Sequence, residues 1–193
     1  RLHPCRQRHG SDLSALALPA GVLRQARDGQ PRPAIHALAD LDQDGDPDLL
    51  LVGESDGTVG VFDNDGNGFF TQRTNTGMPL LQKASSSTAA DYDADGDLDV
   101  LLVQMVHPSS ETFTHHLMRN DGGFQFTDVT AAAGILPGGS TTGTAWGDYD
   151  ADGYLDLHVS NYSWNGAPIN DRLYHNLGNG TFAEVSVALG VDD

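Results

Sequence analysis

Three short apolar runs stand out along the chain, and each follows directly on a stretch of alternating aspartates. The runs are "LLLV" at 49–52, "VLLV" at 100–103 and "LDLHV" at 155–159. They are branched, mostly continuous and of strand length, which is typical of a β-strand that is buried on both faces. No segment shows a strong helical periodicity, and "DVTAAAGI" (128–135) has room for one helical turn at most. The pattern predicts an all-β fold.

The apolar runs belong to a unit that the chain repeats. Turns rich in Asn and Gly begin at Asn64, Asn120 and Asn176, at regular intervals of 56 residues. Such turns tolerate positive φ and favour β-hairpins. A last strand follows each turn, as in "FTDVT" (126–130) and "FAEVS" (182–186). Units of four short strands that recur at about 40–60 residues predict the blades of a β-propeller, whereas a β-helix would need a shorter period and a sandwich would not repeat its sequence.

We expect three blades of four antiparallel strands, at residues 34–83, 84–139 and 140–193, after an N-terminal arm at 1–33. Within the arm, "SDLSALALPAGV" (11–22) is a looser version of "TDVTAAAGI" and is therefore a candidate outer strand of a preceding blade. Three units are too few to close a ring, because propellers typically have about 4–8 blades. Exposed apolar blade faces are unfavourable. We therefore expect a segment of a larger propeller, or a subunit whose end blades are covered by further blades or another chain.

The aspartates before each apolar run recur at fixed positions, as in "DYDADGDLD" (91–99), and loops that begin at Asp40 and Asp148 share the pattern. Two carboxylates this close repel by roughly 1 kcal/mol in water and by several times more near a protein surface, so a cation is needed to hold them together. Oxygen-only, carboxylate-rich ligation selects a hard ion, and a flexible shell of about six or seven oxygens favours Ca²⁺ over Mg²⁺. Glycine at position 6 permits the sharp turn. Position 7 is expected to contribute its backbone carbonyl, which leaves its side chain free to vary.

The predicted ligands of three Ca²⁺ ions are the residues at positions 1, 3, 5, 7 and 9 of these loops. They are Asp40, Asp42, Asp44, Asp46 and Asp48 in the first loop, Asp91, Asp93, Asp95, Asp97 and Asp99 in the second, and Asp148, Asp150, Asp152, Tyr154 and Asp156 in the third. An EF-hand would need a Glu at position 12 and flanking helices, but position 12 is Leu51, Leu102 or Val159. "FDNDGNG" (62–68) also looks like a calcium loop, but it aligns with the hairpin turns of the other units, and we expect a turn there.

The stretch "TAWGDYDADGYLDLHVSNY", followed by "NDRLYHNLGNGTFAEVS", resembles the FG-GAP/VCBS repeat, and the resemblance extends over about residues 34–193. This repeat builds the calcium-binding β-propellers of integrin α-subunits, of the acidic cartilage protein and of many secreted bacterial proteins. The resemblance implies blades of a propeller that has seven of them in most members, with the calcium loops at one rim. It also implies that the twelve aspartates at positions 1, 3, 5 and 9 are ligands. It is specific for the fold and only weakly specific for function.

The formal net charge is −17, but the arm and the rest of the chain differ in sign. Residues 1–36 carry six Arg and two Asp, whereas residues 37–193 carry 25 acidic and four basic side chains. An acidic body repels nucleic acid and anionic membrane surfaces, and no apolar run approaches the ~18–20 residues that span a bilayer. We therefore expect neither nucleic-acid binding nor direct membrane insertion. Cys5 is the only cysteine, which excludes an internal disulfide.

These features favour a non-catalytic interaction or scaffold module that presents its rim loops, including 106–116 and 161–171 with Tyr162 and Trp164, to a protein or a glycan. The weak calcium affinity of typical extracellular modules suits a secreted, cell-surface or periplasmic location. Two alternatives stay open: a polysaccharide lyase or hydrolase, and an architectural subunit of a filament or membrane-associated complex. The candidate residues for the enzyme, among which His158 is expected to be packed in mid-strand, are His107, His115, His116, His158, Tyr162 and Arg172.

Overall fold

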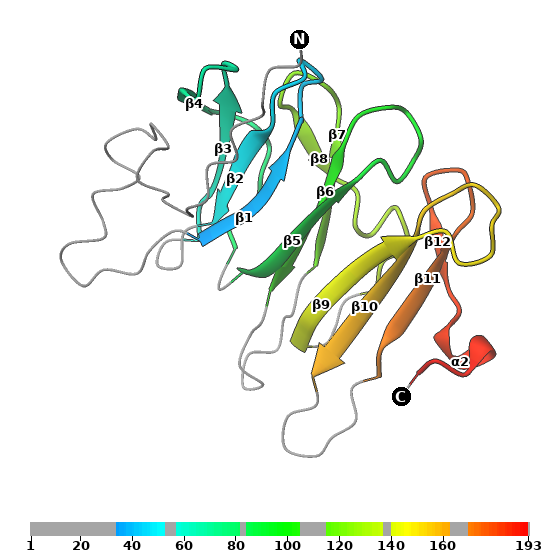
Figure 1. Cartoon of the computed structure of the whole chain (residues 1–193). Helices are drawn as coiled ribbons and strands as arrows, with labels where there is room; N and C mark the ends of the chain where they lie inside the picture. Colours follow the sequence, from blue (N-terminus) through cyan, green and yellow to red (C-terminus); the bar gives the residue numbers. More distant parts are fainter. Residues whose placement is uncertain are drawn as a thin grey trace, which may run out of the picture.

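The described part of the chain forms three separate antiparallel sheets of four strands each (Figure 1). The structure is a computed structural model, and it describes residues 34–52, 57–81, 84–104, 115–136, 140–162 and 170–192. Within each sheet the strands lie side by side in chain order. This is the up-and-down connectivity of a propeller blade, so the predicted all-β fold with four-stranded blades is confirmed.

The first sheet contains β1 (Ala34–Ala39), β2 (Asp48–Val52), β3 (Val59–Asn64) and β4 (Phe70–Arg73). The second contains β5 (Ala84–Ala90), β6 (Asp99–Gln104), β7 (His116–Asn120) and β8 (Phe126–Asp128). The third contains β9 (Ser140–Gly147), β10 (Asp156–Tyr162), β11 (Arg172–Asn176) and β12 (Phe182–Glu184). A single helical turn, α2 (Ser186–Leu189), follows β12.

The acidic loops join the first and second strands of every sheet, and all three lie at the same end of the array (Figure 1). The register of the strand pairs explains why the loops are alike. In each sheet the last residue of the first strand lies opposite the aspartate at position 9, so every loop is closed by an equivalent pair. The closing pairs are Ala39 with Asp48, Ala90 with Asp99, and Gly147 with Asp156.

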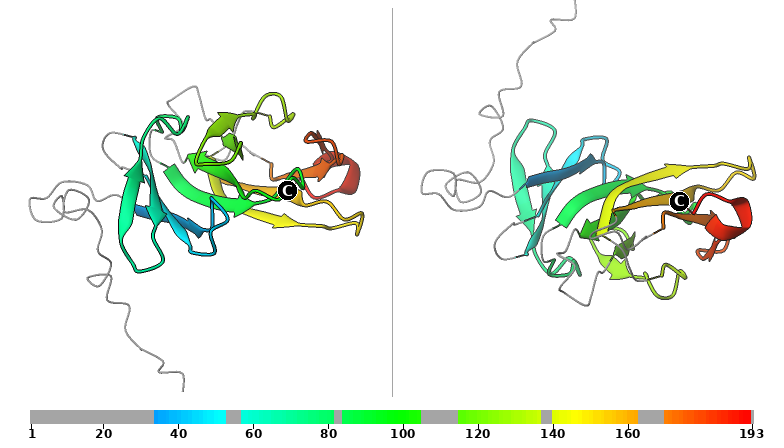
Figure 2. Two further views of the ribbon diagram at one scale, coloured as in Figure 1. Left: turned by 90° about the horizontal axis from the view of Figure 1, so that it is seen from above. Right: turned by 90° about the horizontal axis from the view of Figure 1, so that it is seen from below.

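The sheets pack face to face in chain order (Figure 2), and side chains of the central strands form the cores between neighbouring sheets. Alternate side chains of a strand point to opposite faces. Leu50 and Val52 of β2 therefore pack with Val100 and Leu102 of β6. By the same rule, Leu101 and Val103 of β6 pack with Leu157 and Val159 of β10. Every residue of β2 and β6 is buried, as the two apolar runs predict.

The third apolar run departs from this expectation. His158 and Ser160 of β10 occupy the positions that alternate with the core residues, and both are only partly buried. The side chain of His158 is 39% exposed, so the prediction that it is packed in mid-strand is wrong. The physical reason is that no described sheet lies on this face of the third blade (Figure 1).

Backbone hydrogen bonds tie the segment that follows β4 or β8 to the outer strand of the next sheet. The N–H of Phe126 donates to the carbonyl of Thr76 at 2.8 Å, and the N–H of Phe182 donates to the carbonyl of Ala133 at 2.8 Å. The residue after Thr76 is Gly77, with φ 80°, and a Cβ atom there would lie 2.1 Å from the carbonyl oxygen of Phe126. Only glycine allows the two backbones to approach this closely.

The segment 62–68 contains the end of β3 and the hairpin turn that leads to β4, in agreement with the predicted turn. The N–H of Asp65 donates to the carbonyl of Phe69 at 3.1 Å, and the Asp65 carboxylate accepts from the N–H of Asn67 at 2.9 Å. The Asp65 side chain therefore serves the turn itself.

Residues 1–33, 105–114 and 163–169 lie outside the described part of the chain. They contain the arm with its candidate strand, His107, Trp164 and most of the two long rim loops. Where the chain is described, none of its helices has the length and apolar character needed to cross a membrane.

Candidate metal centres

The same hydrogen bonds fold each acidic loop back on itself. In the first loop, Oδ2 of Asp40 at position 1 accepts from the N–H of Gly45 at position 6, at 3.0 Å. The equivalent bonds join Asp91 to Gly96 at 3.1 Å and Asp148 to Gly153 at 3.0 Å. The three glycines have φ between 95° and 100°, a conformation that side chains strongly disfavour. The predicted role of glycine at position 6, which is to permit the turn, agrees with this geometry.

The aspartate at position 9 is fully buried and connects its loop to the third strand of the blade. Asp48 accepts from the N–H of Leu41 at 2.8 Å and from the N–H of Asn64 at 3.0 Å. Asp99 accepts from Tyr92 and Asn120 at 3.1 and 2.8 Å, and Asp156 accepts from Tyr149 and Asn176 at 3.0 and 2.8 Å. Burial raises the pKa of Asp48 to about 6 and the pKa of Asp99 to about 7, because a desolvated carboxylate disfavours its charge.

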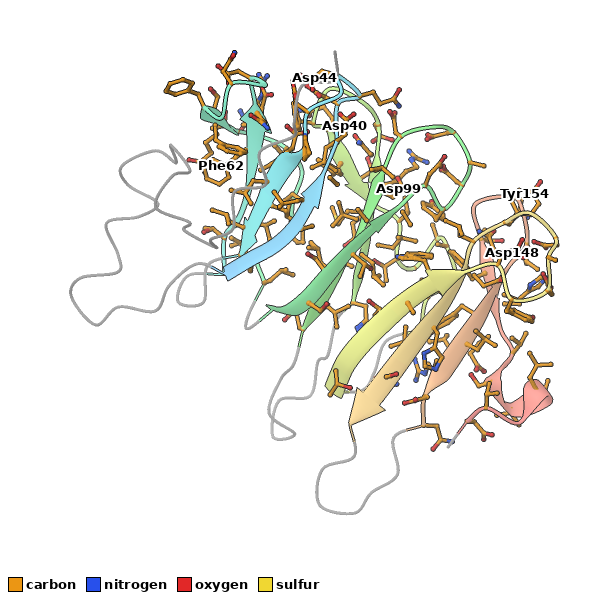
Figure 3. The ribbon with its side chains drawn as sticks, viewed as in Figure 1. Asp40, Asp44, Phe62, Asp99, Asp148 and Tyr154 are labelled. Atoms are coloured by element: carbon orange, nitrogen blue, oxygen red, sulfur yellow. The ribbon has the colours of Figure 1, made fainter. Side chains whose placement is uncertain are left out.

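Carboxylates at positions 1, 3 and 9 converge in every loop. Figure 3 labels one member of each set, namely Asp40, Asp99 and Asp148. In each set, one oxygen from each of the three residues lies within 4.8 Å of the other two. The three sets are Asp40, Asp42 and Asp48; Asp91, Asp93 and Asp99; and Asp148, Asp150 and Asp156. The structure thus brings together nine of the predicted ligands in three equivalent places.

The side chains at position 5 are placed differently. Asp44 lies with Asp42 and Asp63 of β3, and Asp152 lies with Asp150 and His175 of β11. The side chains of Asp95 and, at position 7, of Asp46 and Asp97 belong to none of the side-chain clusters found among the described residues. The backbone carbonyls predicted as ligands at position 7, including that of Tyr154, stay a prediction.

The converging oxygens fit a hard divalent cation. Oδ1 of Asp40, Asp91 and Asp93 is buried and has no hydrogen-bond partner among the described residues. Such buried oxygens are costly unless another group satisfies them. Burial, with the neighbouring carboxylates as a smaller cause, also raises the pKa of Asp42 and Asp93. A donor set made of carboxylate oxygens matches the preference of Ca²⁺.

Asparagines at the ends of β7 and β11 connect each blade to the acidic loop of the blade before it. Nδ2 of Asn120 donates to the carbonyl of Leu41 in the first loop at 2.8 Å and to the carbonyl of Leu98 in its own loop at 3.2 Å. Nδ2 of Asn176 donates in the same way to Tyr92 at 2.8 Å and to Leu155 at 3.0 Å. We call these two residues the clamp asparagines.

Sequence reasoning identified Asn120 and Asn176 only as markers of a turn. Their recurrence at 56-residue intervals was the signal that could have revealed a role in joining the blades. A further contact joins the first two loops directly, because Nε2 of Gln43 donates to the carbonyl of Gly96 at 2.8 Å and to Asp97. The loops therefore form one connected rim.

The candidate residues for the enzyme alternative have separate partners. His115 is 4% exposed, and its Nε2 lies 2.9 Å from Oγ1 of Thr141. Nδ1 of His116 lies 2.7 Å from the Asp128 carboxylate. Nε2 of His158 is 3.8 Å from Asp171. In addition, Arg172 donates to the carbonyl of Leu136 at 3.0 Å, while His107 and the side chain of Tyr162 lie outside the description.

Comparison with protein families gives a match to a family model described as FG-GAP-like repeat, at residues 40–102 and 105–159. These two ranges cover more than half of the chain and contain all three acidic loops. A comparison with curated proteins finds no match.

Proposed function

Because the chain belongs to the FG-GAP-like repeat family, we propose that it is a calcium-stabilised propeller module that binds a protein or glycan partner outside the cytosol. The observation that carries this proposal is the threefold convergence of aspartates at positions 1, 3 and 9. A single acidic turn could be a solvated surface feature, but three equivalent sets at one rim favour a common ligand.

In each loop, the aspartates at positions 1, 3 and 9 would hold the ion. The N–H of glycine at position 6 orients the first carboxylate, and the two backbone donors at position 9 fix the buried one. When bound, Ca²⁺ supplies the positive charge that offsets the mutual repulsion of the carboxylates. The aspartates and the clamp asparagines would then hold the acidic loops as a rigid rim of the module.

A binding role agrees with the family, because FG-GAP repeats are typically non-catalytic. The location proposed is secreted, cell-surface or periplasmic, since extracellular modules bind calcium with dissociation constants of about 10⁻⁴–10⁻³ M and would lack their ion in the cytosol. The acidic body also disfavours nucleic acid as a partner.

Calorimetric titration of the chelator-treated chain with Ca²⁺ tests the metal part of the proposal. We expect three ions per chain, and thermal unfolding should shift upward, because each site contributes about 2.7 kcal/mol at a hundredfold excess over its dissociation constant. Asp40→Asn, Asp91→Asn and Asp148→Asn should each remove one ion. Asp65→Asn is the matched control, because Asp65 bonds only within its hairpin turn. Equal unfolding curves with calcium and with chelator would contradict the proposal.

The binding part is tested by screening the calcium-loaded chain against glycans and extracellular proteins, with a polysaccharide-degradation assay in parallel. Calcium-dependent binding without degradation is the expected result. Release of sugar products would favour the enzyme alternative instead.

A further inference from the structure

One position beside the acidic loops differs in chemistry from blade to blade. The residue directly before Asn64, Asn120 and Asn176, at the end of the third strand, is Asp63, Arg119 and His175 respectively. Asp63 offers an oxygen within 4.8 Å of Asp42 and Asp44, and His175 offers a nitrogen within 4.8 Å of Asp150 and Asp152. The guanidinium of Arg119 pairs with Asp121 at 2.7 Å. The same backbone site thus carries a carboxylate, a guanidinium or an imidazole.

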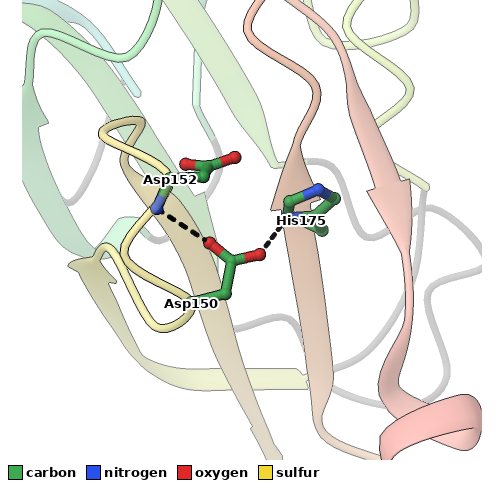
Figure 4. Close-up of side chains that lie close together, drawn as sticks. All are labelled: Asp150, Asp152 and His175. Atoms are coloured by element: carbon green, nitrogen blue, oxygen red, sulfur yellow. Dashed lines mark hydrogen bonds and ion pairs between the residues drawn. The ribbon is translucent and has the colours of Figure 1, made fainter.

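His175 is placed against Asp150 of the third acidic set (Figure 4). Its Nδ1 lies 3.3 Å from Oδ2 of Asp150 and 3.3 Å from Oδ1 of Asp156. Both aspartates belong to the predicted calcium set of the third loop. Nδ1 is buried and has no hydrogen-bond partner of good geometry among the described residues. The ring is held from the side by Tyr149, whose ring centroid is 5.9 Å away at 69°.

An imidazole nitrogen changes which ions a carboxylate site prefers. Carboxylates and carbonyls suit Ca²⁺ and Mg²⁺, whereas imidazole suits Zn²⁺ and other first-row transition ions. Asp63 adds only oxygen to the first loop. Arg119 has no lone pair to offer and cannot be deprotonated in a protein. The third loop is therefore the only one of the three, all of which are described, where this position can supply a nitrogen ligand.

We propose that the third loop is a mixed carboxylate–imidazole site, in which His175 joins Asp150 and Asp156 to bind a first-row transition ion such as Zn²⁺ in preference to Ca²⁺. The first and second loops remain calcium sites. This inference rests on the proposed function, because it assumes that the loops hold cations. It makes His175 the residue that determines which metal the third site takes.

Zinc titration of the full chain in excess calcium, followed by calorimetry at neutral pH, tests the proposal. We expect one zinc ion per chain to displace calcium, and His175→Ala should weaken this event by at least about tenfold, the scale on which loss of a group that supports a metal site lowers affinity. His158→Ala is the matched control, because His158 lies in the same sheet but beside Asp171. Its zinc affinity should equal that of the unaltered chain.

Two exchange variants separate a ligand role from a structural role. His175→Asp gives the third loop the residue of the first, and should lose zinc binding while retaining three calcium ions. Arg119→His gives the second loop the residue of the third, and should create a second zinc site. Calcium binding by the first and second loops reports in every variant that the blades are folded.

The outcomes distinguish this inference from the proposed function. If the unaltered chain binds three calcium ions, and if it binds zinc no more tightly than His175→Ala does, the inference is wrong and the proposed calcium module is unaffected. Failure of the unaltered chain to bind calcium would overturn the proposed function. Zinc binding that depends on His175 would then still support the mixed site.

Discussion

Replacement of Asn120 by alanine should weaken the contact between the first two blades by more than the small volume of the lost side-chain atoms suggests. The side chain is 1% exposed and makes three hydrogen bonds. Two of them run from Nδ2 to the carbonyls of Leu41 and Leu98, and the third runs from the N–H of Gly122 to Oδ1. Only the bond to Leu41 crosses from the second blade to the first.

The magnitude follows from which partners lose their bonds. The Leu41 carbonyl bond is buried, and an unsatisfied buried carbonyl costs about 1–3 kcal/mol. The two part-buried bonds contribute about 0.5–1.5 kcal/mol each. We therefore expect Asn120→Ala to lower the free energy of unfolding by about 4 kcal/mol, within a range of roughly 2–6 kcal/mol. Asn176→Ala should have a similar effect, because it makes the equivalent bonds to Tyr92, Leu155 and Gly178.

Asn64 provides the matched control within the same chain. It occupies the equivalent position in the first blade, but its Nδ2 bonds to Pro47 of its own loop, and both its side-chain bonds are exposed. Asn64→Ala should cost less than about 1 kcal/mol, because exposed hydrogen bonds are readily replaced by water. The assay is urea unfolding in saturating calcium. Equal losses in Asn64→Ala and Asn120→Ala would refute the reasoning that the bond between blades carries the difference.

Three further predictions test other contacts. Gly77→Ala should destabilise the fold by at least about 3 kcal/mol, because the new Cβ atom would lie 2.1 Å from the Phe126 carbonyl oxygen. In the control Gly68→Ala, the new Cβ atom has no atom within 4 Å beyond its chain neighbours, so only the smaller strain of a φ of 87° remains. Equal urea midpoints for the two variants would contradict this prediction. Trp146→Phe should lower the free energy of unfolding by about 1 kcal/mol, because it removes the 3.1 Å hydrogen bond from Nε1 to Oγ1 of Thr88 between the second and third blades. In a double-mutant cycle, this effect should vanish in a Thr88→Val background. Burial, aided by the positive charges of Arg172 and His116, lowers the pKa of His115 to about 4 from its ordinary value of 6.5, so folding favours the neutral ring. The contribution of this neutral ring to stability is therefore complete above about pH 6.5. The contribution of His115 to stability should therefore fall by about 2 kcal/mol between roughly pH 7.5 and pH 5, measured in urea titrations as the difference between the unaltered chain and His115→Gln.

The strands and the acidic loops could be predicted from the sequence because each is a local pattern that recurs. The runs at 49–52 and 100–103 are too apolar for exposed strands, and β2 and β6 are indeed fully buried. The glycine at position 6 marked the loop turns, and the Asn/Gly pattern marked the hairpins. Repetition removed the ambiguity that a single match to any of these patterns would have left.

What the sequence could not reveal depends on pairs of residues far apart in the chain. The bond from Asn120 to Leu41 spans 79 residues, and the bond from Asn176 to Tyr92 spans 84. No local pattern specifies an acceptor on another blade, so both asparagines were interpreted as turn residues. The helical turn α2 is only four residues long, which is too short for a periodicity to be recognised.

The error at His158 has a different origin and bears on what can bind there. The outward positions of the central strands in the first two blades, Leu50 and Leu101, are buried by the next sheet, whereas the equivalent position of the third is a partly exposed histidine. Burial of apolar area is non-directional and would accept many partners. The exposed face of the third blade carries the polar side chains of His158 and Ser160 in place of apolar ones. Each of their hydrogen-bonding groups that a covering surface leaves buried and unpaired costs about 1–3 kcal/mol. A surface that covered this side of the third blade would therefore have to form hydrogen bonds with these groups, because apolar burial alone would leave them unpaired.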